Sequence, residues 1–200
     1  AAVYGASPIF DESLADLRPL NVYGWSKLLF DQWVARQGPD LAAPAIGLRY
    51  FNVYGPNEGH KGRMASVIQH FSRQAAEDGA IRVFAGSHGF GDGEHRRDFV
   101  FVGDVARINL WAWQSSAAGG VYNVGTGEAR TFNAVARAVI DFQGMGEITY
   151  IPFPKDLEGA YQPVTEANIS RLRAAGYDAP FTALETGVTE TLGSNSGAQA

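Results

Sequence analysis

Short apolar runs alternate along the chain with longer stretches whose apolar positions recur every three or four residues, as Trp25, Leu28, Leu29 and Trp33 do. The short runs are typical of buried strands, and the longer stretches are typical of amphipathic helices. We expect strands at residues 45–51, 81–84, 97–102 and 121–124, and helices at residues 21–37, 64–77, 104–113 and 131–142. This alternation predicts an α/β fold with a largely parallel sheet.

The remaining segments carry weaker signals. Residues 1–5 (AAVYG) resemble the end of a strand, and Thr165 is expected to cap a short helix. Residues 85–95 contain four glycines and show no periodicity, which predicts a mobile surface excursion. Residues 193–200 are small and polar, so we expect a disordered tail there.

Composition narrows the class of protein. The 16 Lys and Arg against 21 Asp and Glu give a net charge of −5 without a concentrated basic face, so no nucleic-acid partner is expected. There is no cysteine, and the four histidines lack metal-ligand spacing, so no metal site is expected. No apolar run reaches the roughly 18 residues of a membrane span, and no signal peptide is evident. We therefore expect a cytoplasmic protein without a membrane partner.

Tyr23 and Lys27 lie four residues apart in the first expected helix, so their side chains share one helix face. A nearby cation favours a phenolate, and Lys27 is therefore expected to lower the pKa of Tyr23. Tyr23 is therefore a candidate general base, and Lys27 is the cation expected to lower its pKa. Two exposed helix residues without a role would show the same spacing.

The surrounding motifs favour the catalytic interpretation. NVYGWSK (residues 21–27) is preceded by AAVYG and followed by LRYFNVYGP (residues 48–56), and together they resemble the extended short-chain dehydrogenase/reductase superfamily. The resemblance implies that Tyr23 is the catalytic base and that Lys27 also holds the nicotinamide ribose. It further implies a catalytic Ser or Thr and a Gly-rich nucleotide-binding unit upstream of Ala1. Because the chain also starts without Met, we expect it to be the later part of a larger enzyme.

A second motif indicates a particular family. NEGHKGRMAS (residues 57–66) resembles a segment of the ADP-L-glycero-D-manno-heptose 6-epimerase family, and the likeness continues through HRRDFVFVGDVARINLW, VYNVGTGEARTF, ITYIPFP, EGAYQ and LRAAGYDAPF. The resemblance implies inversion of carbon six of ADP-heptose by transient oxidation and re-reduction with bound NADP, for the inner core of lipopolysaccharide. It assigns Tyr23 to one side of that carbon and Lys61 to the other.

Residue chemistry alone leaves two interpretations of Lys61. Its ammonium group can protonate a developing alkoxide, or it can bind phosphate or solvent at a helix start. The resemblance favours the acid–base role and implies that Tyr23, Lys27, Val53 and Lys61 contact the cofactor. NAD remains an alternative to NADP, because the residue that distinguishes them lies outside this sequence.

The resemblance also implies a set of substrate contacts. They are Asn52, Arg63, His70, Phe84, Ala85, Gly86, Ser87, Arg97 and Tyr161. The guanidinium of Arg97 suits a diphosphate clamp, whereas His70 and Tyr161 have ordinary structural explanations as well. Residues 87–95 form a longer stretch than the family pattern has, which leaves open the geometry around Arg97.

The expected domains follow from the same resemblance. Residues 1–55 would belong to a Rossmann-type NADP-binding domain, and residues 56–192 mainly to a smaller mixed α/β substrate-binding domain, with residues 97–125 returning to the first. A homo-oligomer is implied, with a pentamer as the family expectation. Two alternatives remain: another nucleotide-sugar epimerase or dehydratase of the superfamily, or a catalytically silent sugar-nucleotide-binding fragment.

Overall fold

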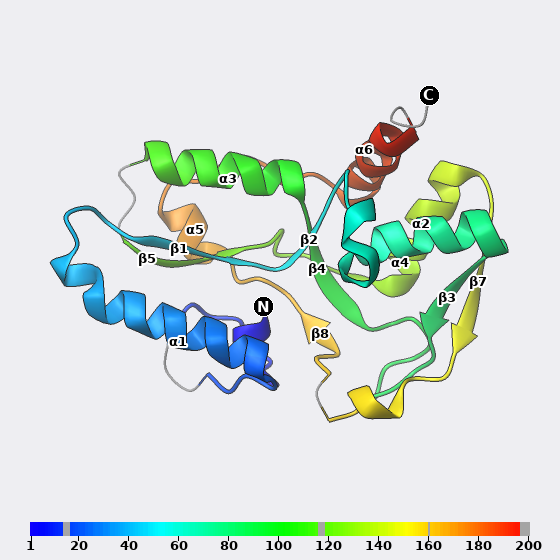
Figure 1. Cartoon of the computed structure of the whole chain (residues 1–200), viewed down its shortest axis with the longest axis horizontal. Helices are drawn as coiled ribbons and strands as arrows, with labels where there is room; N and C mark the ends of the chain where they lie inside the picture. The colour runs from blue at the N-terminus through cyan, green and yellow to red at the C-terminus, as the bar shows by residue number, and fades with distance from the viewer. Residues whose placement is uncertain (14–16, 116–118, 160, 197–200) are drawn as a thin grey trace.

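A computed structural model describes residues 1–13, 17–115, 119–159 and 161–196 of the chain (Figure 1). The helices are α1 (Val22–Gln37), α2 (Val67–Asp78), α3 (Val102–Gln114), α4 (Phe132–Gln143), α5 (Ser170–Ala174) and α6 (Leu184–Ser196). The strands are β1 (Ile46–Tyr50), β2 (Asn52–Tyr54), β3 (Ala80–Phe84), β4 (Arg96–Phe101), β5 (Gly120–Val124), β6 (Ala129–Thr131), β7 (Glu147–Ile151) and β8 (Val164–Thr165). None of the described helices is long and apolar enough to cross a membrane.

One group of elements surrounds the parallel pair of β1 and β5, in which Ile46 lies opposite Gly120. In the view of Figure 1, α3 lies above this pair and α1 below it. Ile108 of α3 and Leu172 of α5 are buried in a cluster around Tyr122 of β5. Burial of these apolar side chains holds the helices on the strand pair.

Helix α1 buries less of its apolar surface than its sequence suggests. Asn21 caps the helix by accepting the N–H of Gly24 at 2.9 Å, at the predicted start. Leu28 is buried with Tyr4 and its neighbours, but Trp25 and Trp33 are exposed. The expected helix is therefore confirmed, whereas its apolar face is only partly covered by the described residues.

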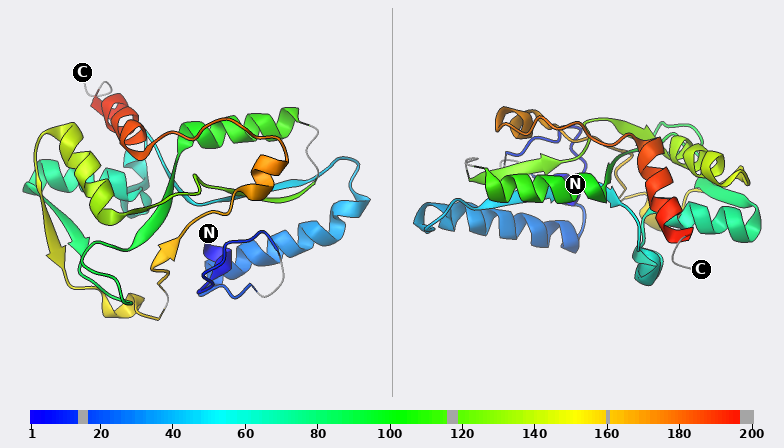
Figure 2. Two further views of the ribbon diagram at one scale, coloured as in Figure 1. Left: turned by 180° about the vertical axis from the view of Figure 1, so that it is seen from behind. Right: turned by 90° about the horizontal axis from the view of Figure 1, so that it is seen from above.

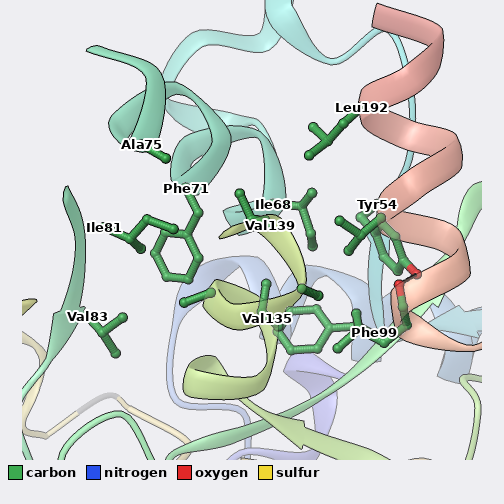
Figure 3. Packing of buried hydrophobic residues seen from close by; sticks show 14 of the residues in the cluster. Tyr54, Ile68, Phe71, Ala75, Ile81, Val83, Phe99, Val135, Val139 and Leu192 are labelled. Atoms are coloured by element: carbon green, nitrogen blue, oxygen red, sulfur yellow. Dashed lines mark hydrogen bonds between the residues drawn. The ribbon is translucent and has the colours of Figure 1, made fainter. Parts of the chain in front are cut away.

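The second group consists of α2, α4 and α6 with the parallel pair of β3 and β7, and it lies at the other end of the molecule (Figure 2). The helices meet in the largest buried cluster, which Figure 3 shows from close by. Side chains from all three helices point into it: Ile68, Phe71, Val135, Val139 and Leu192. Within α2 and α4 these residues recur after three or four positions, which is the spacing of a single buried face.

Strand β4 connects the two groups. It pairs in parallel with β2 and β8 and antiparallel with β6. At its centre, the fully buried carboxylate of Asp98 accepts the N–H and hydroxyl of Thr126 at 2.7 and 2.8 Å, and the N–H groups of Gly127 and Ala167 at 3.0 Å each. Burial raises the pKa of Asp98, and the hydrogen bonds act against that rise. A Cβ on Gly125 would lie 2.6 Å from the carboxylate, so the turn after β5 needs glycine there.

Several local expectations were wrong. Residues 1–5 contain a 3-10 turn, Ala2–Tyr4, in place of a strand end, because the Tyr4 side chain folds inward to contact Asn123. Thr165 belongs to β8 and pairs with Arg97, so it caps no helix. The sequence pattern also missed the strands β2, β6, β7 and β8.

Residues 85–95, which are rich in glycine, and residues 193–196, which are small and polar, are more structured than expected. Residues 85–95 form a folded loop in which the N–H of Gly86 donates to Asp92 at 2.7 Å and the N–H of Gly93 donates to the Phe84 carbonyl at 3.0 Å. Helix α6 continues to Ser196, so residues 193–196 are helical where a disordered tail was expected. Residues 197–200 of that expected tail lie outside the described part of the chain.

The Asp98 network predicts a large effect on stability. Asp98→Ala leaves the backbone N–H groups of Thr126, Gly127 and Ala167 without their acceptor, so the free energy of unfolding should fall by about 3 kcal/mol or more. Chemical denaturation of the purified protein measures this. Asp141→Asn, at an exposed position of α4, should change it by less than about 0.5 kcal/mol. Equal effects of both substitutions would contradict the role of Asp98.

Candidate functional site

The Tyr23 and Lys27 pair lies on the first two turns of α1. The Lys27 Nζ lies 5.2 Å from the centroid of the Tyr23 ring, so the two side chains share one helix face as their spacing predicts. Tyr23 is 63% exposed, and Lys27 is exposed as well. The pair is therefore open to a ligand approaching the start of α1.

Three of the predicted residues line one cleft of about 320 Å³ between β2 and the start of α2: Asn52, Val53 and Lys61. Asn52 begins β2, directly after the chain leaves β1, and lies opposite Phe99 of β4. Lys61 comes from the 3-10 helix Gly59–Met64, which precedes α2. The structure thus brings Lys61 of the 3-10 helix to the same cleft as Asn52 and Val53 of β2.

Glu58 is a member of this cleft that the sequence reasoning did not single out. It is only 4% exposed, and its Oε1 lies 3.7 Å from the Nζ of Lys61, which is 46% exposed by its side chain. Its other oxygen, Oε2, accepts the N–H of Ser66 at 2.5 Å. The buried carboxylate of Glu58 thus holds the ammonium group of Lys61 at the cleft. The signal available in the sequence was an acid three residues before a lysine, which is too common to identify a site.

A second pocket, of about 120 Å³, lies next to the first, because Val67 and Phe132 line both. Its walls include two predicted substrate contacts, Phe84 and Tyr161. The guanidinium carbon of Arg97 lies 4.7 Å from the centroid of the Tyr161 ring and 5.7 Å from that of Phe132. Arg97 is therefore stacked on aromatic rings beside this pocket.

The surroundings shift the pKa values of this stacked pair. Burial lowers the pKa of Arg97, and Tyr161 raises it in part. Burial raises the pKa of Tyr161, while Arg97 lowers it. Tyr161 therefore stays neutral near pH 7, and a guanidinium group remains charged at any physiological pH. The pair presents one fixed positive charge against an aromatic wall, which suits a diphosphate joined to a planar base.

Phe84 lines this pocket, and the three predicted substrate contacts that follow it, Ala85, Gly86 and Ser87, do not. The N–H of Ala85 donates to the Ile151 carbonyl at 2.8 Å, which extends the pairing of β3 with β7. A Cβ at Gly86 would collide with the carbonyl of Phe90, so the loop closes tightly only with glycine there. The Ser87 hydroxyl lies within hydrogen-bond distance of His95, which lines the pocket and was also not singled out from sequence.

His70 and Arg63 lie apart from these two pockets. His70 lines a separate hollow of about 180 Å³ on another side of the 3-10 helix, together with Gly62 and Arg73. Arg63 is exposed and lines none of the three hollows. Their predicted substrate contacts remain predictions. Across the part of the chain that the structure covers, no three His, Asp or Glu side chains gather as a metal site would require.

The arrangement resembles that of known proteins. A curated relative, the ADP-L-glycero-D-manno-heptose-6-epimerase of Alkalilimnicola ehrlichii, is 58% identical over 192 residues, which are 96% of this chain and 60% of the relative. The crystal structure of ADP-L-glycero-D-manno-heptose-6-epimerase from Helicobacter pylori matches with a TM-score of 0.82 and 31% identity, over 98% of this chain and 58% of that one. UDP-glucose 4-epimerase from Thermus thermophilus, solved in complex with NAD, matches with a TM-score of 0.80 and 30% identity, over 98% of this chain and 61% of that one.

These likenesses confirm the predicted α/β class with Rossmann-type parallel sheets. The chain spans about 60% of the length of the relatives it matches. The model of the NAD dependent epimerase/dehydratase family matches residues 1–125, which is more than half of the chain. The chain belongs to the NAD dependent epimerase/dehydratase family.

Proposed function

We propose that this chain provides acid–base and substrate-binding residues of an epimerase that inverts carbon six of the heptose in ADP-D-glycero-D-manno-heptose, for synthesis of the lipopolysaccharide inner core. The observation that carries the proposal is the cleft in which Lys61, paired with the buried Glu58, lies beside Asn52 and Val53. The 58% identity to a relative named for this reaction supports the substrate.

The residues fit a nicotinamide dinucleotide. The Tyr23 hydroxyl and the Lys27 ammonium group share an open helix face, where they can hold the hydroxyls of a ribose. Val53 offers a half-buried apolar contact in the cleft. When bound, the nicotinamide supplies the acceptor and then the donor of the hydride. We propose NADP for this role on the sequence resemblance, with NAD as the alternative.

The chain's own residues perform the proton transfers. Tyr23 takes the proton from the hydroxyl on carbon six as that carbon is oxidised to a ketone, and Lys27 lies beside it on the same helix face. Lys61 gives a proton to the same oxygen when the carbon is reduced again from its opposite face. Glu58 keeps the ammonium group of Lys61 at the cleft. Acid–base groups on two sides of one carbon are what an inversion requires.

The second pocket would bind the nucleotide end of the substrate. The charge of Arg97 suits the diphosphate, and the aromatic wall formed by Phe84 and Tyr161 suits the adenine. We extend this part of the proposal to Ala85, Gly86 and Ser87 and, from the resemblance alone, to Arg63 and His70. A homo-oligomer in the cytoplasm is the assembly and location that we propose for such an enzyme.

A nucleotide-sugar 4-epimerase is the alternative, because the Thermus thermophilus UDP-glucose 4-epimerase matches nearly as well in structure. The two activities separate in a direct assay. The protein expressed from its complete gene should epimerise ADP-D-glycero-D-manno-heptose and should leave UDP-galactose unchanged. Chromatography that separates the two heptose epimers measures the reaction. Turnover of UDP-galactose without turnover of the ADP-heptose would refute the proposed substrate.

Substitution of the two acid–base residues tests the mechanism. Lys61→Met and Tyr23→Phe each remove one proton-transfer group, so each should lower kcat by about 10²- to 10⁴-fold.

Lys61→Met should leave NADP binding within about threefold, because the Lys61 side chain is half exposed and its charge is screened by solvent. Fluorescence of the reduced cofactor measures this binding. Near-normal turnover of Lys61→Met would refute its role. Arg137→Gln, which removes one positive charge at an exposed position of α4, is the matched control and should retain full turnover.

A further inference from the structure

The Gly-rich loop of residues 85–95 carries two histidines that the proposed reaction does not use. The Ser87 Oγ lies 2.9 Å from the Nδ1 of His88 and 3.0 Å from the Nε2 of His95. The Nε2 of His88 lies 3.0 Å from the carbonyl oxygen of Glu158, which belongs to the segment between β7 and β8. One hydroxyl and two imidazoles therefore connect this loop to a segment 70 residues further along the chain.

The donors and acceptors in this chain of contacts can be assigned. A carbonyl oxygen only accepts, so the Nε2 of His88 carries a proton and its Nδ1, in the neutral ring, accepts from the Ser87 hydroxyl. The Nε2 of His95 also lies 3.1 Å from the Ser87 carbonyl, so it too carries a proton and donates to Ser87. The hydrogen bonds then run in one direction, from His95 through Ser87 and His88 to Glu158. Each atom from the His95 Nε2 to the Glu158 carbonyl oxygen then has a partner of the right kind.

Burial and backbone conformation indicate that the surrounding structure holds these residues in place. His95 is 1% exposed, and burial lowers its pKa, which favours the neutral ring that the assignment requires. His88 has a φ of 54°, a left-handed conformation that is uncommon for residues other than glycine. Such strain persists where surrounding contacts compensate for it. Here the compensating contacts are the hydrogen bonds on both sides of the His88 ring.

The linked segment carries Tyr161, the aromatic wall of the second pocket. The ring centroid of His95 lies 5.1 Å from that of Tyr161, and the ring centroid of His88 lies 5.9 Å from it. Phe153 packs against both histidines and lies 5.0 Å from Tyr161. On its other side, Tyr161 contacts the guanidinium of Arg97. The position of Tyr161 thus depends on the loop that His88 and His95 hold.

We propose that Ser87, His88 and His95 form a hydrogen-bonded latch that closes the Gly-rich loop onto the segment carrying Tyr161 and so holds Tyr161 against Arg97. His88 and His95 are then positioning residues for the nucleotide end of the substrate. This inference rests on the proposed function, in which Tyr161 and Arg97 bind that end. It also assigns a task to the loop of residues 85–95, where the sequence predicted a mobile excursion.

Two substitutions of His88 separate the latch from a general structural role. Asparagine tolerates the left-handed backbone and can accept from the Ser87 hydroxyl, but its side chain is too short to reach the Glu158 carbonyl. Glutamine places an amide N–H near the position of the His88 Nε2 and can rebuild that hydrogen bond. In the protein expressed from its complete gene, His88→Asn should raise KM for the ADP-heptose about tenfold, with kcat within about twofold. His88→Gln should stay within about threefold of the unsubstituted KM.

Hydrogen–deuterium exchange provides a readout that does not depend on activity. His88→Asn should speed exchange in peptides covering residues 85–95 and 153–165, and His88→Gln should restore slow exchange there. Unchanged KM and unchanged exchange in His88→Asn would overturn the latch, as would an equal loss of kcat in both variants. If the unsubstituted protein does not epimerise ADP-heptose, the proposed function fails, while the exchange experiment still decides whether the latch exists.

Discussion

The buried carboxylate of Asp98 is the interaction on which the rest of the structure depends. It accepts hydrogen bonds from the turn after β5 and from the segment after β8, and it sits on the strand that joins the two groups of elements. A buried charge without these donors would be strongly unfavourable, so the carboxylate and the two segments order one another. Gly125 completes the arrangement because no side chain fits beside the carboxylate.

Strand β4, which carries Asp98, sets the geometry of both pockets. Residues on either side of Asp98 point to the face opposite it, since side chains alternate along a strand. Phe99 lines the cleft that holds Lys61, and Arg97 stacks on Tyr161 at the second pocket. A sugar bound beside Lys61 and a nucleotide bound beside Arg97 would therefore be held at a separation set by one short stretch of β4. The anchored strand explains how residues from distant parts of the chain can act on one substrate.

Two of the residues that the sequence analysis overlooked, Glu58 and His95, act through other residues. Glu58 reaches Lys61 by an ion pair and the start of α2 by a hydrogen bond. His95 reaches Tyr161 by ring contact and Ser87 by hydrogen bonds. Neither residue has a distinctive spacing in the sequence, because its partners are defined by burial and by the path of the loops. The same reason explains why residues 85–95 looked like an unstructured excursion: hydrogen bonds from Gly86 and Gly93 to nearby groups leave no periodic pattern.

The sequence by itself determined the α/β class, the positions of α1 to α4 and of β1, β3, β4 and β5, the starts of α1 and α4 next to Asn21 and Thr131, and the shared face of Tyr23 and Lys27. These features depend on local periodicity and capping chemistry, which act over a few neighbouring residues. Tertiary structure alone decided that Asn52, Val53 and Lys61 line one cleft, that His70 lies outside it, and that Thr165 pairs in a strand. Those outcomes depend on contacts between residues far apart in the chain, and the strength of such contacts comes from burial, which a linear pattern of residues does not contain.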